Sequence, residues 1–226
     1  MTRVRELAAN LEAVERRIGA ACDRVGRARG EVTLVVVSKT WPADDVRRLA
    51  GLGVTDVGES RDQEAAAKHA ACADLGLRWH FVGQLQSKKA RQVRAYASAI
   101  HSVDRMSLVD ALRSDESSVD CFVQVDLTDD PGRGGVAPEG LDELVEHVLA
   151  TPGLRLRGLM AVAPLGEPPR PAFARVRLLS ERIRRLAPDA TDLSMGMSHD
   201  FREAILEGAT HLRIGTAITG NRPDAG

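Results

Sequence analysis

Eight short apolar runs, each followed by a segment with helical periodicity, constrain the fold of this chain more than any other feature. The runs are rich in β-branched residues and end at glycine, proline or polar clusters, as buried strands do. We expect strands at residues 33–38, 54–58, 79–83, 99–103, 121–127, 156–162, 191–195 and 211–215. We expect the helices between them at residues 43–53, 61–71, 87–97, 107–115, 140–151, 172–187 and 200–209. Strands that alternate with helices predict a parallel sheet.

Eight such repeats within 226 residues predict an α/β fold, a single (β/α)8 TIM barrel. Apolar residues that recur every three or four positions indicate an additional amphipathic helix over residues 2 to about 27. We therefore expect a single domain, with this helix first and the barrel at about 31 to 223. An open doubly wound sheet is the alternative, but its GxGxxG fingerprint is absent at the required strand-to-helix position.

Composition and charge exclude several classes of partner. The formal net charge is -1, which gives no overall attraction to nucleic acid or to an anionic membrane. Three cysteines without a CxxC pair favour a reducing compartment. The charged N-terminus does not match a signal peptide, and no apolar stretch approaches the roughly 20 residues that span a bilayer. We expect a cytoplasmic monomer that binds neither nucleic acid nor membrane.

The last two predicted strands lead into loops that suit an anion. Barrels of this kind carry their chemistry at the carboxyl ends of the strands, and often bind phosphate in the loops after strands seven and eight. Ser198 or Asp200 is expected to cap the following helix, with Glu203 completing a capping box. Backbone N–H groups at a helix start bind anions. Gly215 allows close approach of the backbone, and Thr216 supplies a hydroxyl donor.

Two cationic residues share the predicted face of the barrel. Lys39 follows the first strand, and Arg213 lies within the last one. Burial and a nearby cation would make the lysine amine nucleophilic, and the arginine is a permanently charged donor. An amine, a phosphate cradle and a charged partner for a ring nitrogen together fit pyridoxal phosphate. A Schiff-base aldolase acting on a sugar phosphate would use the first two and stays open as an alternative.

Six motifs make the chain similar to a known family. They are VVVSK at 35–39, WHFVGQLQSKKA at 79–90, HSVD at 101–104, RGLMA at 157–161, LSMGMSHDF at 193–201 and RIGTAITGNR at 213–222. With these motifs, the chain resembles the pyridoxal phosphate homeostasis proteins over nearly its whole length. That family has the barrel fold of the N-terminal part of bacterial alanine racemase.

The resemblance implies a set of residues that bind pyridoxal 5'-phosphate. It implies that Lys39 carries the cofactor as a Schiff base and that Arg213 faces the pyridine nitrogen. The residues expected to hold the phosphate are Ser198, Gly215 and Thr216. His80 and Met160 match positions that line the pocket. Three departures from the family pattern leave the details of the pocket open: Ser60 in place of asparagine, Asp126 where asparagine is common, and Arg133 where lysine is common.

The same residues favour a carrier over an enzyme. Racemases of related fold take a catalytic tyrosine from a second domain, whereas the one tyrosine here, Tyr96, lies in a predicted outer helix. Arginine leaves the pyridine nitrogen unprotonated, which makes the ring a weaker electron sink. We expect a protein that stores, buffers or delivers pyridoxal phosphate, with apo forms of pyridoxal-phosphate enzymes as candidate partners. The alternative is a single-domain racemase-like enzyme. The basic residues at 87–94 would be a docking patch or, more simply, a solvated helix face.

Overall fold

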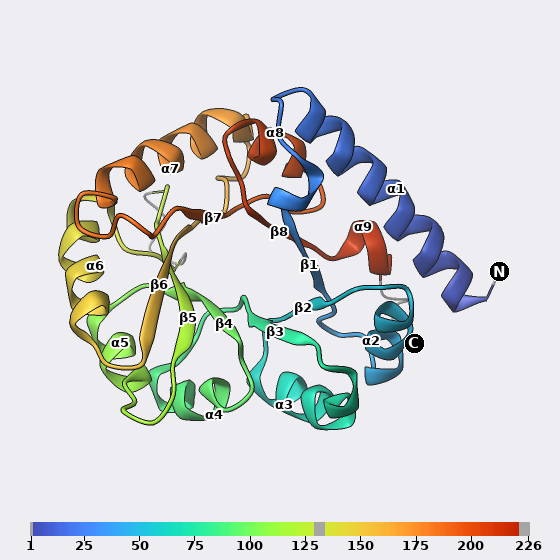
Figure 1. Cartoon of the computed structure of the whole chain (residues 1–226), viewed down its shortest axis with the longest axis horizontal. Helices are drawn as coiled ribbons and strands as arrows, with labels where there is room; N and C mark the ends of the chain where they lie inside the picture. Colours follow the sequence, from blue (N-terminus) through green and yellow to red (C-terminus); the bar gives the residue numbers. More distant parts are fainter. Residues whose placement is uncertain (1, 129–133, 222–226) are drawn as a thin grey trace.

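Eight parallel strands close into a barrel, which Figure 1 views end-on. The structure is a computed structural model that describes residues 2–128 and 134–221. Each strand pairs with the next in sequence, and β8 pairs with β1 to complete the ring. The strands are β1 Thr33–Val37, β2 Asp56–Glu59, β3 Arg78–Phe81, β4 Ala99–Val103, β5 Val119–Gln124, β6 Leu154–Met160, β7 Asp192–Ser194 and β8 His211–Ile214. The predicted (β/α)8 TIM barrel is confirmed, and every expected strand overlaps an observed one.

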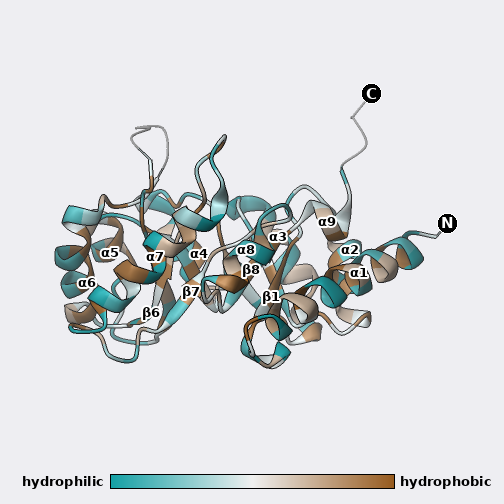
Figure 2. Ribbon diagram, turned by 90° about the horizontal axis from the view of Figure 1, so that it is seen from above, coloured by the Kyte–Doolittle hydropathy of each residue, from teal (hydrophilic) through white to brown (hydrophobic). Residues whose placement is uncertain are grey.

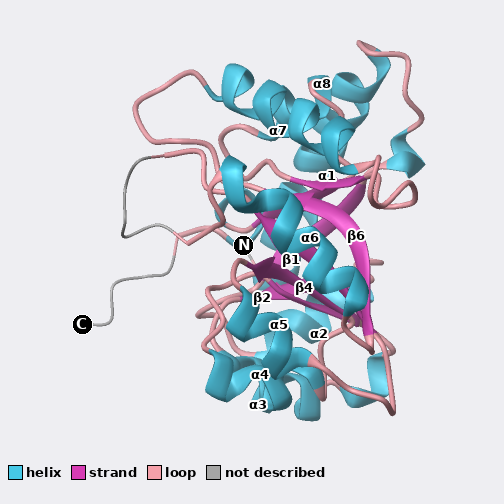
Figure 3. Ribbon diagram, turned by 90° about the vertical axis from the view of Figure 1, so that its left-hand side faces the viewer, coloured by secondary structure: helices cyan, strands magenta, loops and turns pink. Residues whose placement is uncertain are grey.

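Helices form a ring around the barrel (Figures 1 and 3). They are α1 Arg3–Asp23, α2 Ala43–Gly51, α3 Asp62–Ala71, α4 Ala90–Arg94, α5 Met106–Leu112, α6 Leu141–Ala150, α7 Pro169–Ile183, α8 Phe201–Leu206 and α9 Thr216–Thr219. Short 3-10 helices cover Arg29–Glu31, Ala73–Leu75, Ser87–Lys89 and Pro138–Gly140. Figure 2 shows apolar and polar residues on the same helices, as expected when one face packs on a sheet. No helix in the described ranges combines the length and apolar character needed to cross a membrane.

The N-terminal helix α1 covers the side of the barrel where α8 and α9 lie (Figure 1). Its apolar stripe is buried, and Leu7 and Ile18 are fully enclosed. The Arg3 guanidinium bonds to the buried Asp45 carboxylate of α2 at 2.8 Å, which ties α1 to the start of the barrel. The predicted helix is confirmed, although it ends before residue 27 because Gly26 adopts a positive φ of 66°.

Polar side chains occupy part of the barrel interior, where many barrels have branched aliphatic residues. His80, His101, Ser194 and Arg213 are all buried there, on four different strands. Around them, the packing between strands and helices is apolar, with Phe81, Phe173 and Phe201 among the enclosed side chains. Burying a polar group costs free energy unless the group is hydrogen-bonded. These four residues therefore need hydrogen-bond partners inside the barrel.

Candidate functional site

Lys39 lies in a tight turn directly after β1, on the face where the strands have their carboxyl ends; we call this face the mouth. The Trp41 N–H bonds back to the Ser38 carbonyl at 3.1 Å, and Thr40 has a φ of 68°. A β-branched residue rarely adopts this conformation, which costs about 1–3 kcal/mol. The Lys39 side chain is exposed and makes no hydrogen bond or ion pair with the described residues. The burial that would help to make this amine nucleophilic is therefore not observed.

A buried ion pair supports this turn from below. The Lys68 amine of α3 donates to the Ser38 carbonyl at 2.8 Å and to the Glu59 carboxylate at 2.7 Å. The Ser38 hydroxyl donates to the same carboxylate oxygen at 2.7 Å. Burial raises the pKa of Glu59, although Lys68 and Ser38 act against this shift. The pair joins β1, β2 and α3 beneath Lys39, and our sequence analysis missed Lys68 because it sits inside an ordinary helical pattern.

The expected phosphate site lies where the loop after β7 meets α9. The Ala217 N–H donates to the Ser198 hydroxyl at 3.2 Å. The N–H groups of Gly215 and Thr216 have no acceptor among the described residues, as is usual at a helix start. The structure therefore brings Ser198, Gly215 and Thr216 together, with N–H donors free for an anion.

Gly215 also places this loop beside Lys39. A Cβ atom on Gly215 would lie 3.2 Å from the Val37 carbonyl oxygen, so the end of β8 packs closely against the end of β1. Since Lys39 follows Val37 by two residues, the free N–H groups and the lysine share one part of the mouth.

The predicted cap of α8 is only partly correct. Asp200 is the N-cap residue, but its carboxylate accepts the Met197 N–H at 2.6 Å and does not bond into the helix. Glu203 therefore forms no capping box. The carboxylate closes the preceding turn, which carries Ser198.

Arg213 is buried and bonds across the wall of the barrel. Its guanidinium donates to the Ser194 hydroxyl at 2.7 Å and to the Ala161 carbonyl at 2.9 Å. Burial lowers its pKa to about 10, and nearby Asp200 opposes the shift. The group stays protonated at neutral pH. An arginine has five N–H donors, and these two bonds leave others without an acceptor among the described residues.

Met160 lies beside this arginine. It is the last residue of β6, is buried, and pairs in register with Ser194 of β7. The carbonyl that Arg213 bonds belongs to the next residue, Ala161. The structure therefore brings Met160 and Arg213, two of the predicted site residues, together.

A chain of hydrogen bonds runs from Arg213 through the barrel interior. The Ser194 hydroxyl bonds to His101 Nδ1 at 2.7 Å, and His101 Nε2 bonds to His80 Nδ1 at 2.9 Å. His80 Nε2 then bonds to the Asp56 carboxylate at 2.8 Å. Our sequence analysis missed His101, Ser194 and Asp56 as members of this site. Burial raises the pKa of Asp56, but hydrogen bonds from His80 and Thr55 outweigh that effect and the net shift is downward.

The residues at the two ends of this series of hydrogen bonds, Arg213 and Asp56, constrain which atoms carry the hydrogens. Arg213 can only donate and an ionised Asp56 can only accept, and bonds that all point from the arginine toward the carboxylate satisfy both ends. Burial lowers the pKa of His101 well below its usual value, so this ring is neutral. We infer that both histidines carry their hydrogen on Nε2. Both nitrogens of His80 are thus occupied, and a pocket contact from its ring would use carbon atoms.

Other predicted residues have local structural roles. The Asp126 carboxylate accepts the Thr128 N–H at 2.9 Å and shapes the loop after β5. Ser60 lines a cavity at the mouth, and Arg133 lies outside the described residues, as do 222 and 223 at the expected end of the barrel. Tyr96 packs against the His69 ring at 5.9 Å, between α3 and α4.

The basic segment 87–94 is partly used for structure. The Arg94 guanidinium bonds to the Leu112 and Gly153 carbonyls at 2.9 and 3.0 Å. Lys89 lies 3.5 Å from Asp62. The Arg94 donors are thus occupied within the fold, and Asp62 offsets the charge of Lys89.

Comparison with known proteins shows the family to which this chain belongs. The family "Alanine racemase, N-terminal domain" matches residues 9–223. The pyridoxal phosphate homeostasis protein of Mycobacterium leprae is 40% identical, over 95% of this chain and 92% of its own. That of Pseudomonas aeruginosa is 42% identical, over 96% of both chains. The chain belongs to the pyridoxal phosphate homeostasis protein family.

Solved structures extend the comparison. PipY of Synechococcus elongatus PCC7942, solved with PLP bound, has a TM-score of 0.82 and 34% identity, covering 95% of this chain and 100% of its own. Alanine racemase from Corynebacterium glutamicum has a TM-score of 0.70 at 16% identity, covering 99% of this chain and 62% of its own. The racemase thus shares the fold, and family membership rests on the closer relatives.

Proposed function

We propose that this protein binds pyridoxal 5'-phosphate and stores, buffers or delivers it, with Lys39 bonding covalently to the cofactor aldehyde. The observation that supports this most is the meeting of β1 and β8, where Gly215 packs on Val37. That contact brings the turn that carries Lys39 close to the loop whose N–H groups have no acceptor among the described residues. Family relatives carry the same function in their names, and PipY was solved with PLP bound.

Each end of the cofactor has a matching group in this chain. The N–H groups of Gly215 and Thr216 would hold the phosphate. Because Ser198 accepts the Ala217 N–H, its own hydrogen remains available for a phosphate oxygen. Arg213 is protonated at neutral pH and would donate to the pyridine nitrogen. His80 and Met160 would line the ring. The bound cofactor supplies an electron sink, which an unprotonated pyridine nitrogen weakens.

We infer a carrier and not a racemase from the position of the tyrosine. Tyr96 lies between α3 and α4, outside the strand ring, where it cannot exchange a proton with a substrate at the mouth. The three cysteines are buried and unpaired, which favours a reducing compartment such as the cytoplasm. We propose a monomer, organised as one domain, that passes cofactor to apo forms of pyridoxal-phosphate enzymes.

Mass spectrometry tests the covalent step. The purified protein is incubated with pyridoxal phosphate, reduced with borohydride and digested. We expect the adduct on the peptide that contains Lys39, and no adduct or visible absorption band in Lys39→Arg, which keeps the charge. An adduct on another peptide, or none, would overturn the proposal. Racemisation of amino acids that depends on Lys39 would instead support the enzyme.

A further inference from the structure

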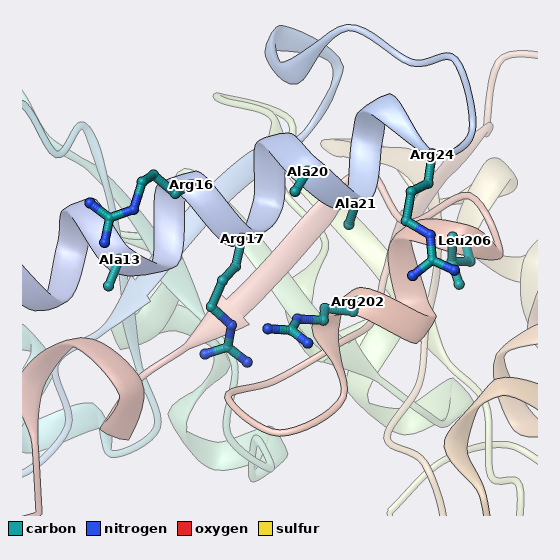
Figure 4. A pocket seen from close by; sticks show the side chains of 8 residues that line it. All are labelled: Ala13, Arg16, Arg17, Ala20, Ala21, Arg24, Arg202 and Leu206. Atoms are coloured by element: carbon teal, nitrogen blue, oxygen red, sulfur yellow. The ribbon is translucent and has the colours of Figure 1, made fainter.

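A groove lined by arginines runs between α1 and α8 (Figure 4). Its volume is about 440 Å³. Its lining includes the apolar residues Ala20, Ala21 and Leu206 and three arginines, Arg17, Arg24 and Arg202, which we call the rim arginines. We call these six residues the arginine groove. The two alanines leave room for another chain to approach closely.

The three rim arginines lack carboxylate partners within residues 2–128 and 134–221. Arg16, which also lines the groove, differs because it bonds to Glu12 at 2.7 Å. Arg17 lies over the Phe201 ring at 4.7 Å, and its Nε is buried without a hydrogen bond. Like charges gathered in one groove repel each other. The buried Nε is out of reach of a ligand, so a ligand in the groove would bond to the accessible N–H groups of the guanidiniums. The groove therefore favours an anionic ligand that supplies acceptors.

The spacing of the arginines limits what that ligand can be. Arg17 lies in α1 and Arg24 is the residue that caps its C-terminus, seven positions further on, which corresponds to two helical turns or about 10 Å. Figure 4 shows Arg202 reaching from α8 toward Arg17, and Arg24 near Leu206 further along. A compact anion such as phosphate would reach one of these positions and leave the other unpaired. A second helix with carboxylates seven residues apart would reach both.

We propose that the arginine groove docks an acidic amphipathic helix of a partner protein. Carboxylates on the partner would pair with Arg17, Arg202 and Arg24, and small or apolar residues between them would pack on Ala20 and Ala21. This surface uses none of the residues assigned to the cofactor, so it stands whether or not Lys39 carries pyridoxal phosphate.

A designed peptide tests the proposal directly. The probe is a fluorescently labelled helical peptide of about 20 residues, rich in alanine and leucine, with glutamates at seven-residue intervals. We expect fluorescence anisotropy to show binding to the unaltered protein, and Arg202→Glu to weaken that binding by about tenfold or more. Arg184→Glu, the same charge change at an exposed residue after α7, is the matched control and should bind as before.

Charge exchange adds a specific readout. A second peptide with lysines in place of the glutamates facing Arg202 should regain binding to Arg202→Glu. The pyridoxal phosphate absorption of Arg202→Glu should be unchanged, which separates this test from the proposed function. Absence of peptide binding, equal loss in Arg184→Glu, or preferential binding of inorganic phosphate or a single-stranded oligonucleotide would overturn the proposal.

Discussion

At the scale of single residues, hydrogen-bond partners decide what a buried polar group contributes. Ser102 on β4 and Ser194 on β7 are both buried strand serines. The Ser194 hydroxyl links Arg213 to His101, whereas the Ser102 hydroxyl has no partner among the described residues. The same serine-to-alanine change should therefore have different effects at the two positions.

We expect Ser194→Ala to lower the free energy of unfolding by about 1–3 kcal/mol, because Arg213 and His101 each lose a partner while remaining buried. Ser102→Ala should leave stability unchanged or raise it, since an unpaired hydroxyl is removed. Urea unfolding of both variants at neutral pH measures the difference. Equal losses would show that the hydrogen bonds of Ser194 to Arg213 and His101 contribute no stability.

Cofactor retention should depend on the two anchors proposed for the ring and the phosphate. We expect Arg213→Ala to weaken equilibrium binding of pyridoxal phosphate by about tenfold or more, because a charged hydrogen bond is lost. Thr216→Val removes the hydroxyl but keeps the backbone N–H, so its effect should be smaller. Equilibrium dialysis measures both. Unchanged binding in both variants would contradict the proposed site.

At the scale of secondary structure elements, the Glu59–Lys68 pair joins β1, β2 and α3 under the Lys39 turn. Removing one partner of a buried pair leaves an uncompensated charge, whereas neutralising both is often tolerated. The stability of this region should thus depend on the pairing of the two residues more than on either alone.

We expect Lys68→Met to lower the free energy of unfolding by about 3–5 kcal/mol. Adding Glu59→Gln should restore more than half of that loss, because the unpaired carboxylate is gone. A double-mutant cycle from urea unfolding gives the coupling. Additive losses would mean that the two side chains act independently.

At the scale of the whole molecule, the polar interior makes the stability of the barrel depend on pH. Burial lowers the pKa of His101 well below its usual value and that of His211 to about 4. As pH falls below about 6.5, histidines in the unfolded chain take up protons while these two stay neutral in the fold. Acidification therefore favours the unfolded state.

We expect the free energy of unfolding to fall between pH 6.5 and about 4, by roughly 1.4 kcal/mol per pH unit for each of these histidines. His101→Gln should reduce this slope, because one of the two buried imidazoles is removed. Urea midpoints at neutral pH and at two acidic values within this range give the slope. An identical slope in the variant would show that His101 takes up its proton in the folded protein as readily as in the unfolded chain.

The sequence by itself determined the elements and their order. The apolar runs and the helical periodicity are local patterns, and residues 33–37 show the strand pattern without reference to any neighbour. The strand ends also placed Lys39, Ser198 and Gly215 on one face, because all strands of a parallel barrel end together.

Tertiary structure alone decided which polar groups meet. His101 and Ser194 are 93 residues apart in sequence, and their contact exists because β4 and β7 turn these side chains into one interior. The exposure of Lys39, its support by Lys68, and the unpaired arginines between α1 and α8 likewise depend on how helices pack around the closed ring. Side-chain partners across a barrel follow from its closure and stagger, which no local pattern encodes.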